Sequence, residues 1–350
     1  MGRHLVDLDA FDSHKTIDIL NTASDILKNP EEYSERMRGK ILATLFYEPS
    51  TRTCMSFQSA MMRLGGQVLG FSDPQNSSVS KGESLKDTVK VVANYADAIV
   101  IRHPREGTAA AAAIYSSVPV INAGDGAHLH PTQTLTDLFT LMQTKGRLSG
   151  LNIGLCGDLK YGRTVHSLIK AVSKFGGNKF TLISTEELSL PGYIKDVINE
   201  YGCSFTEVNS LADAVAGLDV LYMTRIQKER FDSAEEYARQ KGVFVLDVAK
   251  LKPAGQDMII MHPLPRIDEI AHEIDDDERA VYFDQTKYGL YARMALILHL
   301  LEDKTDTPQK FTSNSDKPCC NDKCITKFED YLPLIYNDGK CAYCEWRVKI

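Results

Sequence analysis

The fold of this chain is decided by the stretch Phe46-Tyr47-Glu48-Pro49-Ser50-Thr51-Arg52-Thr53. An apolar run at 41–46 precedes its loop and is typical of a buried strand, and apolar residues at helical spacing follow it. Three hydroxyls and one guanidinium therefore stand at the start of a predicted helix, where free N–H groups and the helix dipole favour anions. The planar arginine fork matches phosphate oxygens. The stretch predicts a phosphate-binding strand–loop–helix unit, and the alternative is an ordinary capped helix with a surface arginine.

Similar strands recur along the chain. Short apolar runs alternate with helical patterns, which indicates an α/β fold with mainly parallel sheets. The strands are predicted at 41–46, 67–71, 98–102, 118–122, 152–156, 180–183, 220–223, 243–246 and 258–261. Arg102 ends one of these runs, and polar motifs follow three others, namely Gly157-Asp158, Thr224-Arg225 and His262-Pro263. Because ligands bind outside the carboxyl ends of strands in open α/β sheets, this placement predicts one shared cleft.

Composition excludes several classes of protein. The 350 residues suffice for two domains, and 43% hydrophobic with 25% charged residues is typical of a globular protein. A net charge of −7 without a basic stripe argues against nucleic-acid binding. No run approaches the ~20 apolar residues of a membrane span, and the first residues lack a signal-peptide apolar region. We therefore expect a cytoplasmic protein with no membrane partner.

Cysteines cluster near the end of the sequence. The pairs Cys319-x₄-Cys324 and Cys341-x₂-Cys344 could supply four thiolates to a tetrahedral Zn²⁺ ion. In a cytosolic chain such pairs favour a metal over disulfides. The neighbouring Cys320 leaves the first ligand ambiguous. The alternative is a disordered tail with incidental cysteines.

Several motifs carry a family resemblance. The chain resembles the transcarbamoylases through Ser50-Thr51-Arg52-Thr53, His130-Pro131-Thr132-Gln133 and His262-Pro263-Leu264-Pro265, which occur in the family's order. The motifs at 157–164 and 222–227 make it similar to the catalytic chains of aspartate carbamoyltransferases in particular. The resemblance spans about residues 4–305. It implies transfer of the carbamoyl group of carbamoyl phosphate to L-aspartate, the committed step of pyrimidine biosynthesis, with no cofactor for catalysis.

The resemblance also implies the domain plan of two doubly wound α/β domains. Residues 1–133 would bind carbamoyl phosphate and residues 134–287 aspartate, with a helix from Pro131 joining the two. A late helix at about 288–301 would return to the first domain. The polar stretch 302–318 is typical of a linker, and 319–350 would form the zinc-binding segment.

Site residues follow from the matched motifs. The carbamoyl phosphate ligands implied by the resemblance are Ser50, Thr51, Arg52, Thr53, Ser77, Arg102, His130, Gln133, Pro263 and Leu264. Arg52, Thr53 and His130 would face the carbonyl oxygen, where charge develops in the transition state. A histidine before proline can also be a purely structural hydrogen-bonding group. We favour His130 as a hydrogen-bond donor to the carbonyl rather than as the general base.

The second substrate is indicated by charge. Aspartate carries two carboxylates, and the resemblance assigns Arg163 to the α-carboxylate and Arg225, with Gln227, to the side-chain carboxylate. Ornithine carbamoyltransferases are the rival within the family, but they usually place cysteine where this chain has Pro263. An idle scaffold protein with the same fold is the rival of another class. Glu48 and Arg230 resemble the residues that hold the closed arrangement of the domains, with Glu48 bridging to Arg163 and Arg230.

The loop motif Ser77-Ser78-Val79-Ser80-Lys81-Gly82-Glu83 completes the site implied by the resemblance. Lys81 matches the family's active-site lysine, which also contacts aspartate, and Ser77 matches a phosphate-binding serine, although Ser78 lies beside it. Ser80 stands where the family often has a first lysine. In the family this loop reaches the neighbouring subunit's cleft, so the resemblance implies a homotrimer with shared sites, with dimers of trimers as a further possibility. The cysteine segment resembles a shortened zinc domain of the aspartate carbamoyltransferase regulatory chain.

Overall fold

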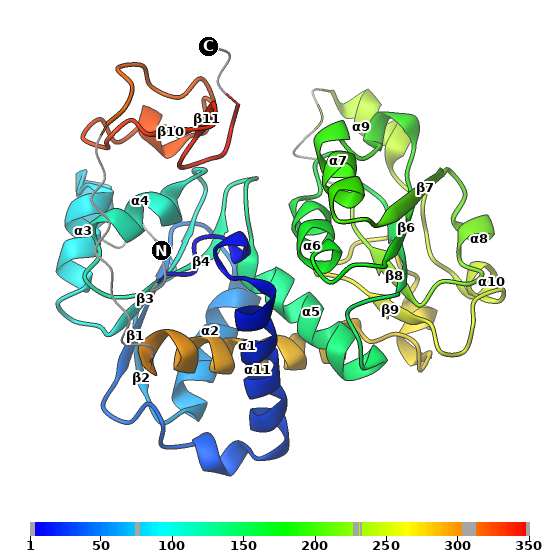
Figure 1. Cartoon of the computed structure of the whole chain (residues 1–350), viewed down its shortest axis with the longest axis horizontal. Helices are drawn as coiled ribbons and strands as arrows, with labels where there is room; N and C mark the ends of the chain where they lie inside the picture. Colours follow the sequence, from blue (N-terminus) through cyan, green and yellow to red (C-terminus); the bar gives the residue numbers. More distant parts are fainter. Residues whose placement is uncertain (1–3, 74–77, 227–230, 232, 303–312, 348–350) are drawn as a thin grey trace. The chain divides into compact units, whose positions relative to one another are not determined.

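A computed structural model describes residues 4–73, 78–226, 231, 233–302 and 313–347 (Figure 1). The chain forms two compact units, one of residues 1–135 with 290–350 and the other of residues 136–289. Each unit is built on its own parallel sheet, which confirms the predicted α/β class.

The first unit has a four-stranded parallel sheet in the order β2-β1-β3-β4. Its strands are β1 (Ile41–Phe46), β2 (Gln67–Phe71), β3 (Ala98–His103) and β4 (Val120–Asp125). Its helices are α1 (Ser13–Lys28), α2 (Thr51–Arg63), α3 (Leu85–Val92) and α4 (Thr108–Tyr115), with a 3-10 turn η4 (Ser78–Lys81) before α3. The sheet is wound outward in both directions from the β1–β3 pair, where Phe46 is in register with Arg102. This pair is the topological switch point, where open sheets bind ligands.

The second unit has a five-stranded parallel sheet in the order β7-β6-β5-β8-β9. Its strands are β5 (Asn152–Cys156), β6 (Lys179–Ile183), β7 (Ser204–Val208), β8 (Val220–Met223) and β9 (Ile259–Met261). Its helices are α6 (Arg163–Ser173), α7 (Gly192–Glu200), α8 (Leu211–Ala214), α9 (Ala234–Gln240) and α10 (Val248–Leu251). Here the switch point lies between β5 and β8, where Cys156 is in register with Met223.

Two helices belong to both units. α5 (Pro131–Lys145) begins at the predicted proline, and α11 (Tyr282–Glu302) begins six residues before the predicted late helix. The boundaries between units fall inside these helices, at residues 135–136 and 289–290. Among the described residues, no helix has the length and apolar character needed to cross a membrane.

Two strand assignments from the sequence need correction. The segment 243–246 forms no strand, and only Leu246 makes an isolated bridge, to Ile270. Strand β7 is absent from the sequence prediction, because its residues are mostly exposed and polar at the edge of the sheet.

The C-terminal segment packs on the first unit. It contains the short antiparallel pair β10 (Tyr336–Asn337) and β11 (Lys340–Cys341). Figure 1 shows this segment, in orange and red, beside α3 and α4. Its buried residues Ile325, Leu332 and Tyr343 share one hydrophobic cluster with β1, β3 and both of these helices. The segment is therefore part of the core of the first unit.

Candidate active site and metal centre

The first half of the candidate site lies at the amino end of α2. Ser50 is the N-cap residue, and its side chain makes no capping hydrogen bond. Thr51 and Arg52 are exposed and Thr53 is buried in the first turn. The hydroxyls and N–H groups of this turn therefore lie at the positive end of a helix dipole, which is where a helix favours a bound anion.

A second guanidinium lies beside this turn. Arg102, at the end of β3, forms a 2.7 Å ion pair with Glu48 and donates to the Ala123 carbonyl at 3.2 Å. Partial burial and the positive charge of Arg102 lower the pKa of Arg52. Two guanidiniums that repel each other in this way would both be stabilised by a bound phosphate.

His130 completes this cluster at the start of α5. Its Nε2 atom lies 3.4 Å from Nη1 of Arg102, and the side chain is buried. A guanidinium can only donate, so Nε2 is the acceptor in this contact and the donor role toward the carbonyl stays a prediction. Gly124, at φ +117°, makes room for both groups, since a Cβ there would lie 3.1 Å from Arg102 Nη1. Gln133, half-buried, stands in the first turn of the same helix.

Lys81 lies in a different segment, exposed at the end of η4. Ser77, Gln227 and Arg230 lie outside the described residues. Glu48 pairs with Arg102 in this structure, so its predicted bridges to Arg163 and Arg230 stay predictions.

The second unit has its own set of candidate site residues at the β5–β8 switch point. Gly157 follows β5 at φ +119°, and a Cβ there would lie 2.3 Å from the Thr224 carbonyl oxygen. Only glycine therefore lets the ends of the two strands approach so closely. Arg163 starts α6 beyond β5, and Arg225 follows β8. Arg225 lines a small pocket with Thr224 and other residues of this unit, namely Gly157, Ile226, Tyr237, Lys241, Gly242, Phe244, Ile267, Asp268 and Glu269.

The loop after β9 is held by a buried histidine. His262 Nδ1 accepts the Leu264 N–H at 2.8 Å, so the ring carries its proton on Nε2, which donates to Glu269 at 2.7 Å. Leu264 adopts φ +53°, an uncommon conformation for a leucine. Burial alone would raise the pKa of Glu269, but His262 and backbone N–H groups lower it overall. The pair therefore fixes the backbone at Pro263–Leu264.

A buried carboxylate connects this loop to two helices. Asp137 of α5 accepts from the Tyr222 hydroxyl at 2.9 Å and from the Gln285 amide at 2.6 Å. The side-chain oxygen of Gln285 accepts the backbone N–H of His262 at 3.0 Å. His262 belongs to a motif visible in the sequence, whereas Glu269, Asp137 and Gln285 stand in no such motif and are found only through their contacts in the fold.

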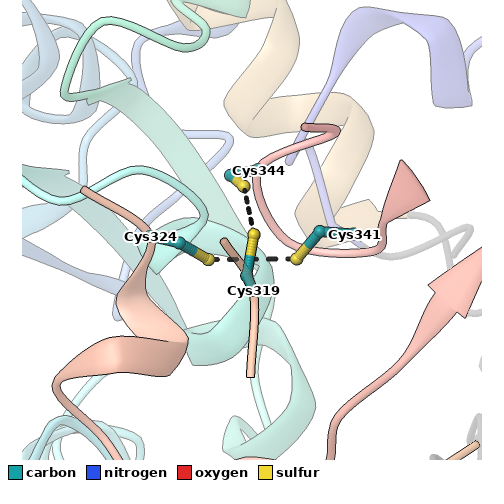
Figure 2. A group of neighbouring side chains, drawn as sticks. All are labelled: Cys319, Cys324, Cys341 and Cys344. Atoms are coloured by element: carbon teal, nitrogen blue, oxygen red, sulfur yellow. Dashed lines mark hydrogen bonds between the residues drawn. The ribbon is translucent and has the colours of Figure 1, made fainter. Parts of the chain in front are cut away.

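The four paired cysteines form a cluster in the C-terminal segment that could hold a metal ion. Figure 2 shows their sulfur atoms turned toward one another, 3.6 Å apart for Cys319 and Cys344 and 3.9 Å apart for Cys324 and Cys341. All four ligand atoms lie within 4.8 Å of one another and are buried. A tetrahedral ion with Zn–S bonds of ~2.3 Å requires sulfurs about 3.8 Å apart, whereas a disulfide requires ~2.05 Å. The spacing fits a metal ion.

The surroundings of the sulfurs agree with this assignment. Thr326 donates its hydroxyl to the Cys324 sulfur, and the Asn321 N–H donates to the Cys319 sulfur. The hydrogen bond with Cys341, together with burial, raises the pKa of Cys324 to about 12, and a cation would remove this penalty on the thiolate. Cys320 is exposed and stands outside the cluster, so the structure favours Cys319 as the first member of the candidate ligand set.

Two family models match this chain in succession. Residues 3–143 match the carbamoyl-P binding domain of aspartate/ornithine carbamoyltransferases, and residues 149–300 match the Asp/Orn binding domain. The chain belongs to the aspartate/ornithine carbamoyltransferase family. The second family match ends before the cysteine segment, which therefore lies outside both matched domains.

Individual relatives within the family are similar over nearly their whole length. The aspartate carbamoyltransferase catalytic subunit of Clostridium novyi is 56% identical over 300 residues, which cover 86% of this chain and 98% of the relative. The catalytic subunit of M. jannaschii aspartate transcarbamoylase has a TM-score of 0.81 and 48% identity, with 86% of this chain and 99% of that chain covered. The Trypanosoma cruzi enzyme, solved with N-(phosphonacetyl)-L-aspartic acid, has a TM-score of 0.80 and 36% identity, with 85% and 95% covered.

Proposed function

We infer that this chain is an aspartate carbamoyltransferase, which transfers the carbamoyl group of carbamoyl phosphate to the amine of L-aspartate. The observation that carries this conclusion is the near-full-length similarity to aspartate carbamoyltransferase catalytic subunits, at 56% identity over 300 residues. The products are N-carbamoyl-L-aspartate and phosphate.

Carbamoyl phosphate is proposed to bind at the amino end of α2. Ser50, Thr51, Arg52, Thr53 and Arg102 would hold the phosphate, with Ser77 as a further ligand by resemblance. The lowered pKa of Arg52 beside Arg102 supports this assignment, because both cations gain from an anion between them. The carbamoyl amide would be held by Gln133 and by the backbone at Pro263–Leu264.

Aspartate is proposed to bind through Arg163, Arg225, Gln227 and Lys81. The place of Arg225 just beyond β8, at the switch point of its sheet, supports the assignment for the side-chain carboxylate. The amine then attacks the carbonyl carbon, and Arg52, Thr53 and His130 stabilise the charge on the carbonyl oxygen. As the intermediate collapses, the carbon–oxygen bond to phosphate breaks and phosphate leaves with a proton from the amine. Glu48 and Arg230 are proposed to hold the arrangement in which both substrates react.

Assay of purified protein with carbamoyl phosphate tests this function directly. We expect N-carbamoyl-L-aspartate to form from L-aspartate, with far slower reaction of ornithine under the same conditions. Because Arg225 and Pro263 replace the features of an ornithine site, citrulline formation at a comparable rate would overturn the proposed specificity. Formation of neither product would overturn the proposed activity.

We propose zinc as the metal of the cysteine centre, since four thiolates at tetrahedral spacing match its preferred coordination. The ion would supply a structural cross-link, and Cys319, Cys324, Cys341 and Cys344 would hold it. A cytoplasmic location and a homotrimer with shared active sites, with dimers of trimers as a further possibility, complete the proposal. The spacing of the paired cysteines, which suits a metal rather than disulfides, supports the cytoplasmic location, and the family resemblance supports the trimer.

The metal proposal predicts about one zinc ion per chain. The double variant Cys341→Ser plus Cys344→Ser should lose this ion, because it removes half of the ligands. Elemental analysis of protein purified without chelators measures the content. Cys320→Ser, outside the cluster, is the matched control and should keep the metal. Equal zinc in all three proteins would contradict the assignment.

A further inference from the structure

The C-terminal segment supplies the hydrogen-bond acceptors that complete the start of α3. The helix caps itself only in part, since the Ser84 hydroxyl accepts the Asp87 N–H at 3.1 Å. The N–H of Leu85 donates to Glu329 Oε1 at 3.2 Å, and the N–H of Lys86 donates to the Tyr331 hydroxyl at 2.9 Å. Two N–H groups to which the Ser84 side chain is not bonded are therefore satisfied by residues more than 240 positions away.

Charge favours the same contact. A carboxylate at the amino end of a helix interacts favourably with the helix dipole. Burial and a hydrogen bond with Glu329 raise the pKa of Tyr331, so the phenol remains neutral. The Lys86 ammonium lies 5.5 Å from the centroid of the Tyr331 ring and 5.3 Å from that of Tyr115. These contacts hold the side chain of Tyr331 against α3 and α4.

The segment that makes these contacts is itself firmly docked. Glu106 donates its N–H to the Lys323 carbonyl at 3.0 Å and accepts the Ile325 N–H at 2.9 Å, as in a parallel strand pair. Its buried carboxylate accepts from the Asn321 amide at 2.7 Å. Gly107 sits so close that a Cβ there would lie 2.6 Å from Cβ of Tyr343. Backbone hydrogen bonds to Glu106 thus fix the cysteine cluster against the residues that precede α4.

Lys81 lies four residues before α3, whose first turn is held by Glu329 and Tyr331. Between them, Glu83 accepts the Thr88 hydroxyl at 2.7 Å, which ties the connecting residues to the first turn of the helix. The position of the Lys81 backbone therefore depends on where α3 begins and how well its first turn is held.

We propose that Glu329 and Tyr331 are positioning residues, which hold the amino end of α3 so that Lys81 is presented correctly for carbamoyl transfer. The inference rests on the proposed function, in which Lys81 contacts the substrates. It gives the cysteine segment a part in the reaction of this chain through contacts with its first unit.

The test uses the full-length protein with Tyr331→Phe and Glu329→Ala, separately and together. Tyr331→Phe deletes one oxygen atom and keeps the ring, so the packing is preserved. Matched controls are Tyr336→Phe, whose hydroxyl donates to Lys317 within the segment, and Asp330→Ala, which is exposed. Glu329→Gln keeps an acceptor and should rescue in part.

We expect kcat/KM for aspartate to fall about tenfold in Tyr331→Phe and Glu329→Ala, the effect of losing a hydrogen bond that orders a reacting group. Zinc content and Tm should match those of the controls. Binding of N-(phosphonacetyl)-L-aspartate, measured by calorimetry, should weaken in parallel. In a Lys81→Ala background the same substitutions should weaken this binding no further, because their effect passes through Lys81.

Values within twofold of the controls, or losses that add fully to that of Lys81→Ala, would overturn the inference. Hydrogen exchange at the Leu85 and Lys86 amides provides a readout independent of catalysis. Both amides should exchange faster in the variants, and unchanged exchange would also overturn the inference. A wild-type protein without carbamoyl transfer would refute the proposed function instead, and the exchange result would stand by itself.

Discussion

Replacing Arg225 with alanine should lower kcat/KM for aspartate by ~30-fold to ~5000-fold, because removing one partner of a buried charge pair costs ~2–5 kcal/mol. Arg225 follows β8 at the switch point of the second unit and lines the pocket there. In the proposed function it pairs with the side-chain carboxylate of aspartate. The loss should therefore fall mainly on aspartate, while the KM for carbamoyl phosphate changes little.

Steady-state kinetics with each substrate varied in turn would measure this effect. Arg239→Ala, at an exposed position of α9 in the same unit, is the matched control and should keep nearly full activity. Arg225→Lys should recover only part of the loss, since an ammonium cannot reproduce the planar two-point contact. Near-normal turnover of aspartate by Arg225→Ala would remove the assignment.

The sheets could be predicted from the sequence because their strands are buried. β1, β5 and β8 are apolar almost throughout and are flanked by polar motifs. β7 is different: three of its five residues are exposed, so its pattern resembles that of a surface loop. The run at 243–246 is apolar for another reason, since Phe244 and Leu246 pack into the core without joining the sheet.

The candidate site could be predicted from the sequence only where its residues lie in short motifs. Ser50 to Thr53, Arg102 and His130 each lie near the end of a strand or the start of a helix, and their types already indicate phosphate chemistry. The supporting contacts join residues far apart in sequence, such as Asp137 with Gln285 or Leu85 with Glu329. A single sequence contains no local pattern for such pairs, because folding alone brings them together.

The proposed sharing of active sites between subunits predicts that two inactive variants restore activity when mixed. Lys81→Ala and Arg52→Ala should each be nearly inactive. If Lys81 serves the neighbouring subunit, a chain with intact Arg52 can receive an intact Lys81 from the other variant. In a cyclic trimer of mixed composition this arrangement gives one fully wild-type cleft out of three. Dissociating, mixing and reassembling the two proteins should therefore recover activity that neither parent has.

A pair of variants in the same half of the site gives the decisive control. Arg52 and His130 both belong to the first unit of one chain, with Arg102 between them by contact and charge. Mixed trimers of Arg52→Ala and His130→Ala consequently contain no wild-type cleft and should stay inactive. Native mass spectrometry would verify that mixed trimers form in both experiments. Absence of recovery in verified trimers of Lys81→Ala with Arg52→Ala would mean that each chain builds its site from its own residues, since no cleft would then combine two chains.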